Sequence, residues 1–203
     1  MNINVNDLYT IRKNVFDSIQ NSSTVKKIMM AFLMACFTGI MAQIIIKLPW
    51  TPVPITGQTF AVLTAGLILG KKYGALSQIL YILVGILFIP WFGGMTGGID
   101  IVLGSDIGYF IGFVLTSYFI GSITEKYAKS RKFIRSVLVI GIGNFALIYI
   151  PGLAGLALWA YITQGTILSI ADLLMMGFIP FIFGGIVKVI GASAVSKVFL
   201  PKE

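Results

Sequence analysis

One lysine lies where a charged side chain is costly. Lys188 falls within the apolar run 181–191, and the next lysine, Lys197, follows nine residues later. In a helix this separation is about 13 Å at 1.5 Å per residue, so Lys188 would lie well inside a bilayer, where a lysine costs about 2.5–3.5 kcal/mol. No acid lies inside a predicted span, helix caps excepted, so an anionic ligand is its expected partner. Snorkelling and a structural ion pair are the alternatives.

Polar side chains also follow a proline-rich segment. Residues 49–54 contain three prolines, which exclude a regular helix there. Irregular backbone at membrane depth is tolerated only against protein or a wet cavity. We therefore expect Thr56 and Gln58 to bind a ligand, with Thr59 offering a further hydroxyl. The alternative is a rigid outer loop in which Thr56 or Gln58 caps the following helix.

A glycine-rich loop forms a third candidate region. Residues 93–98 contain four glycines, which let a backbone approach a ligand closely, although they are equally consistent with simple flexibility. The loop lacks a Walker pattern and follows no predicted strand, so it does not predict a nucleotide site. Gly94, Met95 and the preceding Trp91 are candidate ligand contacts, and for Trp91 an interfacial aromatic belt is the other interpretation.

Three further polar side chains lie near or inside predicted helices. Asp106 precedes an apolar run and is expected to be its N-cap. Tyr109 lies one turn further on and faces either a pocket or the lipid boundary. Asn144 is a candidate pocket residue, with an interhelical hydrogen bond as the alternative.

The residue inventory excludes several kinds of chemistry. The chain has no histidine, which removes histidine-based triads and His-ligated metals. The single cysteine, Cys36, cannot form an internal disulfide. No credible nucleophile–base pair remains, so we expect no catalysis, no cofactor and no metal.

These side chains must be positioned by membrane helices. The 203 residues are 57% hydrophobic and 11% charged, whereas a soluble chain carries about 25% charged residues. A spanning helix needs about 20 apolar residues. The sequence therefore predicts an all-α integral membrane protein with one membrane domain (28–203) and six transmembrane helices, at about 28–48, 58–70, 74–89, 107–124, 136–161 and 176–200.

Cations predict the topology. The net charge is +8, and apart from Lys188 the Lys and Arg residues fall mainly before the first predicted span, on every second connection and at the end of the last span. The other connections hold only Lys47. Both termini are therefore expected in the cytoplasm, and this membrane interpretation outweighs nucleic-acid binding. Residues 1–27 are expected to form a cytoplasmic amphipathic segment, because apolar residues recur at helical spacing at Val5, Leu8, Ile11, Val15 and Ile19.

Small residues spaced four apart predict close helix contacts. Ala31, Ala35 and Gly39 form such a stripe on the first predicted span, which would pack against a helix of this chain or of a partner. The same spacing recurs at Gly104, Gly108 and Gly112.

Several segments in order resemble one family. The run Val53-Pro54-Ile55-Thr56-Gly57-Gln58-Thr59, followed by 65–70, resembles the signature of the BioY family, the biotin-specific S-components of energy-coupling factor (ECF) transporters. The similarity runs from about residue 31 to 194 and includes 81–85, 90–94, 104–113 and 180–188. It implies a six-helix ECF S-component-like bundle in the cell membrane that captures biotin from outside. Its partners would be a transmembrane coupling subunit and two cytoplasmic ATPases.

The resemblance also implies roles for individual residues. Ala31 and Ala35 match an alanine motif that contacts the coupling subunit, Lys188 matches a lysine of the vitamin pocket, and Tyr81 occupies a pocket position. The expected substrate-binding residues are Thr56, Gln58, Tyr81, Trp91, Gly94, Met95, Tyr109, Asn144 and Lys188, and the expected partner interface is Ala31, Ala35 and Gly39.

Two positions depart from the family pattern. Gly185 stands where the family usually has an aspartate, and Met95 and Thr96 occupy a stretch that often contains an arginine. These departures leave open another small carboxylate vitamin, such as lipoate. A stand-alone secondary transporter is the remaining alternative, disfavoured because carrier coupling usually needs an intramembrane acid or histidine.

Overall fold

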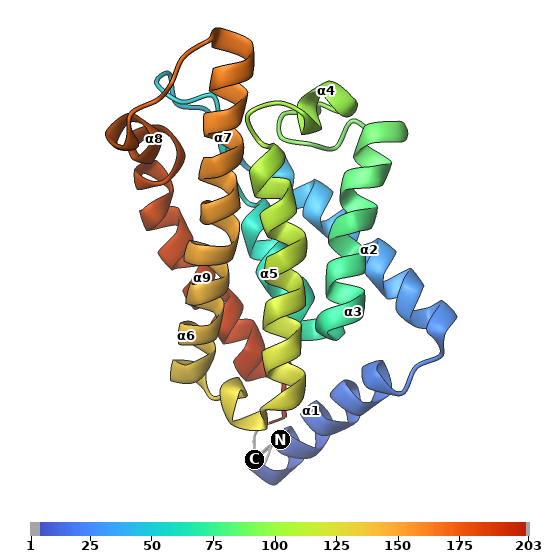
Figure 1. The fold of residues 1–203 in the computed structure, drawn as a ribbon. Coiled ribbons are helices and arrows are strands. Elements are labelled where there is room, and N and C mark those ends of the chain that lie inside the picture. The colour runs from blue at the N-terminus through green and yellow to red at the C-terminus, as the bar shows by residue number, and fades with distance from the viewer. Residues whose placement is uncertain (1–4, 202–203) are drawn as a thin grey trace.

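The computed structural model describes residues 5–201, with side chains from residue 9 onward, and is almost entirely helical (Figure 1). A two-stranded antiparallel hairpin pairs β1 (Ile45–Ile46) with β2 (Ile55–Thr56). The helical elements are α1 (Val5–Gln20), α2 (Thr24–Ala42), α3 (Gln58–Leu87), α4 (Ile99–Val102), α5 (Ile107–Lys126), η1 (Ala128–Arg131), α6 (Phe133–Ile142), η2 (Gly143–Ile148), α7 (Tyr149–Gln164), α8 (Ile170–Gly177), η3 (Ile179–Phe181) and α9 (Ile182–Phe199).

Six passes arise because α3 folds back on itself. Five segments of the described chain are long and apolar enough to span a membrane, and α3 is one of them. Within α3, Gly70 adopts φ +75° and ψ −175°, outside the helical region. The side chains of Gln58 and Tyr81, 23 positions apart, are joined by a hydrogen bond of 2.6 Å, whereas a straight helix would separate them by about 35 Å. The two halves of α3 therefore run antiparallel, which confirms the predicted spans on either side of residue 70.

Glycines let α5 lie in the centre of the bundle. A Cβ on Gly112 would lie 2.7 Å from the Cα of Ile148, and one on Gly108 would overlap the carbonyl of Pro151. A Cβ on Gly66 of α3 would lie 2.5 Å from the carbonyl oxygen of Ser117. The predicted close contact at the small-residue spacing of α5 is confirmed for Gly108 and Gly112, which touch η2 and α7.

Three of the predicted spans are interrupted. The first ends at Ala42 rather than at 48, because residues 45 and 46 pair with the strand that follows the prolines. A π-helical turn, η2, precedes Pro151, whose ring nitrogen cannot donate a helical hydrogen bond. The last predicted span breaks at Pro180, which lies in the 3₁₀ turn η3, so α8 is a separate short helix.

The small-residue stripe of α2 faces the inside of this chain. Ala31 and Ala35 are fully buried, and a Cβ on Gly39 would lie 3.0 Å from the ring of Trp91. Within this chain their side is covered by neighbouring side chains, and their expected contact with a partner subunit stays a prediction. The stripe was predicted to pack against a helix of this chain or of a partner, and the structure shows packing within this chain.

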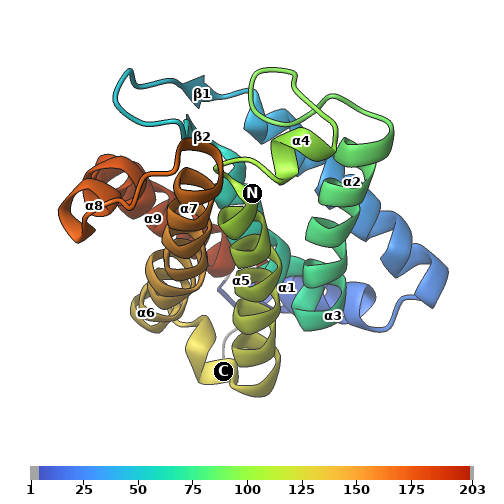
Figure 2. The same cartoon turned by 45° about the horizontal axis from the view of Figure 1, so that its top comes forward.

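The start of α1 and the end of α9 lie at the same end of the bundle (Figure 1). Helix α1 lies across this end, where the guanidinium carbon of Arg131 stands 4.5 Å from the ring centroid of Phe16. Ile11 and Val15 of the predicted apolar face are exposed, and Ile19 is half-buried. The side chains of Val5 and Leu8 lie outside the described residues. The hairpin β1–β2 and α4 gather at the opposite end (Figure 2).

Candidate functional site

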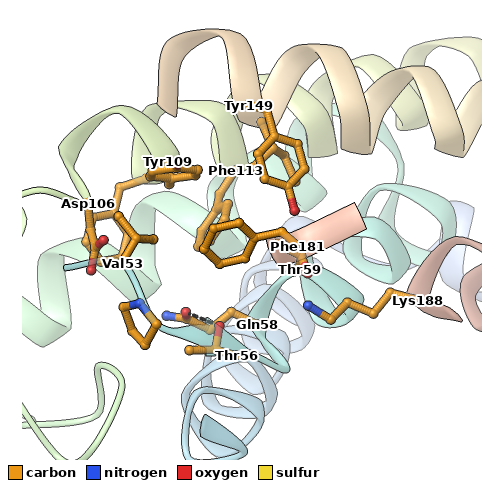
Figure 3. A pocket seen from close by; sticks show the side chains of 13 residues that line it. Val53, Thr56, Gln58, Thr59, Asp106, Tyr109, Phe113, Tyr149, Phe181 and Lys188 are labelled. Atoms are coloured by element: carbon orange, nitrogen blue, oxygen red, sulfur yellow. Dashed lines mark hydrogen bonds between the residues drawn. The ribbon is translucent and has the colours of Figure 1, made fainter. Parts of the chain in front are cut away.

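A cavity of about 480 Å³, including space open to the outside, lies between the proline-rich segment, α3, α5, α7 and α9. Figure 3 shows polar groups at both of its ends and aromatic rings between them. The lining residues are Val53, Pro54, Thr56, Gln58, Thr59, Asp106, Tyr109, Phe110, Phe113, Ile148, Tyr149, Phe181 and Lys188.

Lys188 supplies a cation at one end of the cavity. It lies about 9 Å along α9 from the start of that helix at 1.5 Å per residue, and its ammonium group points toward Thr59 and Tyr149 (Figure 3). In residues 9–201 no carboxylate forms a salt bridge with it. The buried Oγ1 of Thr59 likewise has no hydrogen-bond partner within this part of the chain. This end can therefore receive an anion or another strong acceptor.

Asp106 stands at the other end of the cavity (Figure 3). The prediction that it caps a helix is wrong for the side chain, because Asp106 occupies the N-cap position of α5 but makes no capping hydrogen bond. Its Oδ1 is buried without a partner among the described residues. Burial raises the pKa of this carboxyl, which precedes the spanning helix, to about 6, and a hydrogen bond with Ser105 offsets only part of the shift.

A chain of hydrogen bonds forms one wall. The Thr56 hydroxyl donates to Oε1 of Gln58 at 2.6 Å, and Nε2 of Gln58 donates to the Tyr81 hydroxyl at 2.6 Å. Behind them, the indole N–H of Trp91 donates to the Tyr81 carbonyl at 2.9 Å. Neither Thr56 nor Gln58 caps α3, whose N-cap is Gly57. Thr56 and Gln58 line the cavity, whereas Tyr81 and Trp91 hold Gln58 from behind.

Aromatic rings form the middle of the cavity. Tyr109 and Tyr149 meet edge to face with centroids 6.0 Å apart, and Phe181 packs on both. The Tyr109 hydroxyl donates to the Gly177 carbonyl at 2.7 Å, which fixes its ring against the end of α8. Phe113 lies one turn beyond Tyr109 on the same face of α5. Tyr109 was predicted as a pocket residue, whereas Phe113, Tyr149 and Phe181 were not, because these rings come together only when α5, α7 and η3 pack.

The loop that holds Val53 and Pro54 is attached to α8. The Thr51 hydroxyl donates to the Met176 carbonyl at 2.6 Å, and the Val53 amide donates to the Thr51 hydroxyl at 3.1 Å. Because this segment follows β1 and contains prolines, it has no helical hydrogen bonds of its own. One side-chain contact therefore joins this wall of the cavity to the neighbouring helix.

Two of the predicted ligand contacts lie in the glycine-rich loop, away from this cavity. Gly94 (φ +75°) and Met95 (φ +58°) form the turn between Phe92 and Thr96. Met95 is exposed, and its amide donates to Oε1 of Gln43 at 3.0 Å. The loop is thus positioned by the end of α2.

Asn144 lies behind the cavity and accounts for one departure from the family pattern. Its side chain is fully buried in η2, and neither amide atom has a partner within the described residues. A Cβ on Gly185 would lie 2.9 Å from Nδ2 of Asn144 and 3.0 Å from the ring of Phe145. The space that an aspartate at 185 would need is therefore already occupied.

Comparison with known proteins gives consistent matches over most of the chain. The chain is 43% identical over 139 residues to "Probable biotin transporter BioY" of Methanothermobacter thermautotrophicus, covering 68% of this chain and 88% of the relative. It is 30% identical over 151 residues to "Biotin transporter BioY" of Thermotoga maritima, covering 74% of this chain and 83% of the relative.

A solved structure shares the fold. The crystal structure of the S-component for biotin from an ECF-type ABC transporter superposes with a TM-score of 0.75 over 87% of this chain and 92% of that chain, at 24% sequence identity. The BioY family model matches residues 13–202 of this sequence. The chain therefore belongs to the BioY family.

Proposed function

We propose that this chain is the substrate-binding subunit of an ECF transporter and that its ligand is biotin. The observation that carries the proposal is the half-buried cation of Lys188, which has no salt-bridge partner in residues 9–201 and stands at one end of an aromatic cavity. Biotin combines a carboxylate, an aliphatic tail and a fused ring with a polar ureido edge. The names of the BioY relatives support the same ligand.

The chain's role in this proposal is binding and delivery. As a multi-pass protein of the cell membrane, it would take biotin at the end of the bundle opposite α1 and the end of α9. ATP hydrolysis would come from two cytoplasmic ATPases acting through a transmembrane coupling subunit. The support for these partners is the S-component fold.

The test replaces the charge of Lys188 and keeps its length. Lys188→Met leaves the ligand's carboxylate without a cation, and truncating one partner of a buried charged pair costs about 2–5 kcal/mol. We expect a loss of biotin affinity of roughly 30-fold to several thousand-fold. Binding of radiolabelled biotin to the detergent-solubilised protein measures it.

A matched control removes a lysine of the same helix. Lys197 is exposed near the end of α9, so Lys197→Met should bind biotin as the unaltered protein does. Equal affinity of Lys188→Met and Lys197→Met would exclude Lys188 from the ligand contact. A protein that binds lipoate but not biotin would shift the assignment to the other carboxylate vitamin.

A further inference from the structure

We propose that Asp106 accepts the ureido N–H groups of biotin and thereby fixes the direction in which the ligand lies in the cavity. The proposal rests on the proposed function and adds a recognition residue at the end opposite Lys188.

The position of Asp106 is the first argument. Its side chain lines the cavity beside Val53 and Tyr109, and its Oδ1 is buried without a hydrogen-bond partner among the described residues. No cation in that part of the chain forms a salt bridge with it. A buried acceptor left open is costly, so a structural role alone does not account for it.

The chemistry of the two ends is the second argument. An ionised carboxylate has only acceptors, arranged on two oxygens, and a ureido edge presents two N–H donors. Charge-assisted hydrogen bonds of this kind are about twice as strong as neutral ones. Asp106 repels the ligand's own carboxylate, whereas Lys188 attracts it. Together the two residues favour one of the two possible orientations of an elongated ligand.

The test uses Asp106→Asn, which keeps the size of the side chain but replaces one acceptor with a donor. Hydrogen bonds to charged groups contribute about 1.5–3 kcal/mol, so we expect biotin affinity to fall by about 10- to 150-fold. Asp100→Asn is the matched control, because Asp100 is exposed on α4 near the same end of the molecule. It should leave affinity unchanged. Asp106→Ser serves as a second variant if the asparagine protein does not fold.

Biotin methyl ester identifies which residue binds which end of the ligand. The ester keeps the ureido ring and lacks the carboxylate charge. It should bind the unaltered protein and Asp106→Asn more weakly than biotin by the same factor, because both retain Lys188. In Lys188→Met the difference between ester and acid should disappear.

Two results would overturn the role proposed for Asp106. Asp106→Asn and Asp106→Ser could bind biotin as tightly as Asp100→Asn does, or the ester penalty could vanish in Asp106→Asn and persist in Lys188→Met. If Lys188→Met alone weakens biotin binding, the proposed function stands and only the role of Asp106 fails. If the unaltered protein binds no biotin, the proposed function fails, and the inference with it.

Discussion

At the scale of single residues, the cavity contains groups that destabilise the empty protein. Lys188 is half-buried and Oδ1 of Asp106 is buried, and neither side chain forms a salt bridge in the described part of the chain. Binding sites commonly carry such polar groups at a cost in stability. The hydrogen-bond chain from Thr56 through Gln58 to Tyr81 does not destabilise the empty protein in this way, because each side chain in it has a hydrogen-bond partner. Ligand binding would therefore stabilise the two ends more than this wall.

Asp106 should make stability depend on pH. Its pKa rises from 3.8 to about 6 on burial, so the folded protein with an ionised Asp106 is less stable by about 3 kcal/mol above pH 6. This penalty shrinks as the pH falls from about 6 toward 3.8 and is lost below that, where the carboxyl is protonated in both states. The titratable neighbours Tyr81 and Tyr109 carry phenol groups, which are ordinarily neutral over this range.

The measurement compares melting temperatures of the empty protein in detergent. Asp106→Asn should melt higher than the unaltered protein at pH 7.5, and the difference should shrink as the pH is lowered to 4.5. Asp100→Asn should show no such pH-dependent difference. A constant offset at both pH values would mean that the Asp106 carboxyl is not buried as described.

At the scale of helices, α3 crosses the bundle twice because the chain reverses direction at Gly70. The backbone of Gly70 (φ +75°) is in a region that side chains rarely adopt, and Glu125 closes over the turn through a hydrogen bond of 2.9 Å from the Lys71 amide. The reversal brings Tyr81 back beside Gln58. The geometry of the cavity wall thus depends on a turn at the far end of the helix.

Gly70→Ala should destabilise the protein. The new Cβ would overlap the Glu125 carboxylate, and a side chain in this conformation costs about 1–3 kcal/mol by itself. Gly141→Ala is the control, because a Cβ there meets nothing within 4 Å and alanine favours a helix. We expect a lower melting temperature for Gly70→Ala and an unchanged or higher one for Gly141→Ala. Equal stability of the two variants would contradict a strained reversal at Gly70.

Local sequence predicted the spans well and the relations between spans poorly. Apolar length located every pass, and the proline-rich segment pointed to Thr56 and Gln58 in the cavity wall. The direction in which Ala31 and Ala35 face could not be predicted, because small-residue spacing is the same for an internal and an external contact. Asp106 has the sequence signature of a cap, and only the tertiary fold shows that its side chain faces the cavity.

At the scale of the whole molecule, the basic connection between α5 and α6 and the cavity lie at opposite ends of the bundle. The basic connection that contains η1 lies at the same end as α1, whereas the hairpin β1–β2 lies at the other (Figures 1 and 2). Thr56 of this hairpin and the adjoining Val53 and Pro54 line the cavity. The positive-inside rule predicts that the basic end is cytoplasmic. The cavity would then be reached from outside the cell.

Single cysteines test this orientation. With Cys36 replaced by alanine, Met95→Cys and Lys129→Cys each place a thiol at an exposed position, at opposite ends of the molecule. An impermeant thiol reagent applied to intact cells should label the cysteine at 95 and spare the one at 129. Permeabilised cells should label both. Labelling confined to position 129 in intact cells would reverse the topology.

The loop held by Thr51 would affect the rate at which a bound vitamin leaves the cavity more than it affects the affinity. Affinity in this site would come from the two charged ends, which are anchored on α5 and α9. The wall of Val53 and Pro54 is instead joined to α8 through the Thr51 hydroxyl, and a single hydrogen bond contributes only about 0.5–1.5 kcal/mol net. Detachment of this loop would break that hydrogen bond and also expose Val53, which is buried in the core. The residence time of a bound vitamin would then depend on how often the loop detaches, in addition to the contacts that hold the vitamin.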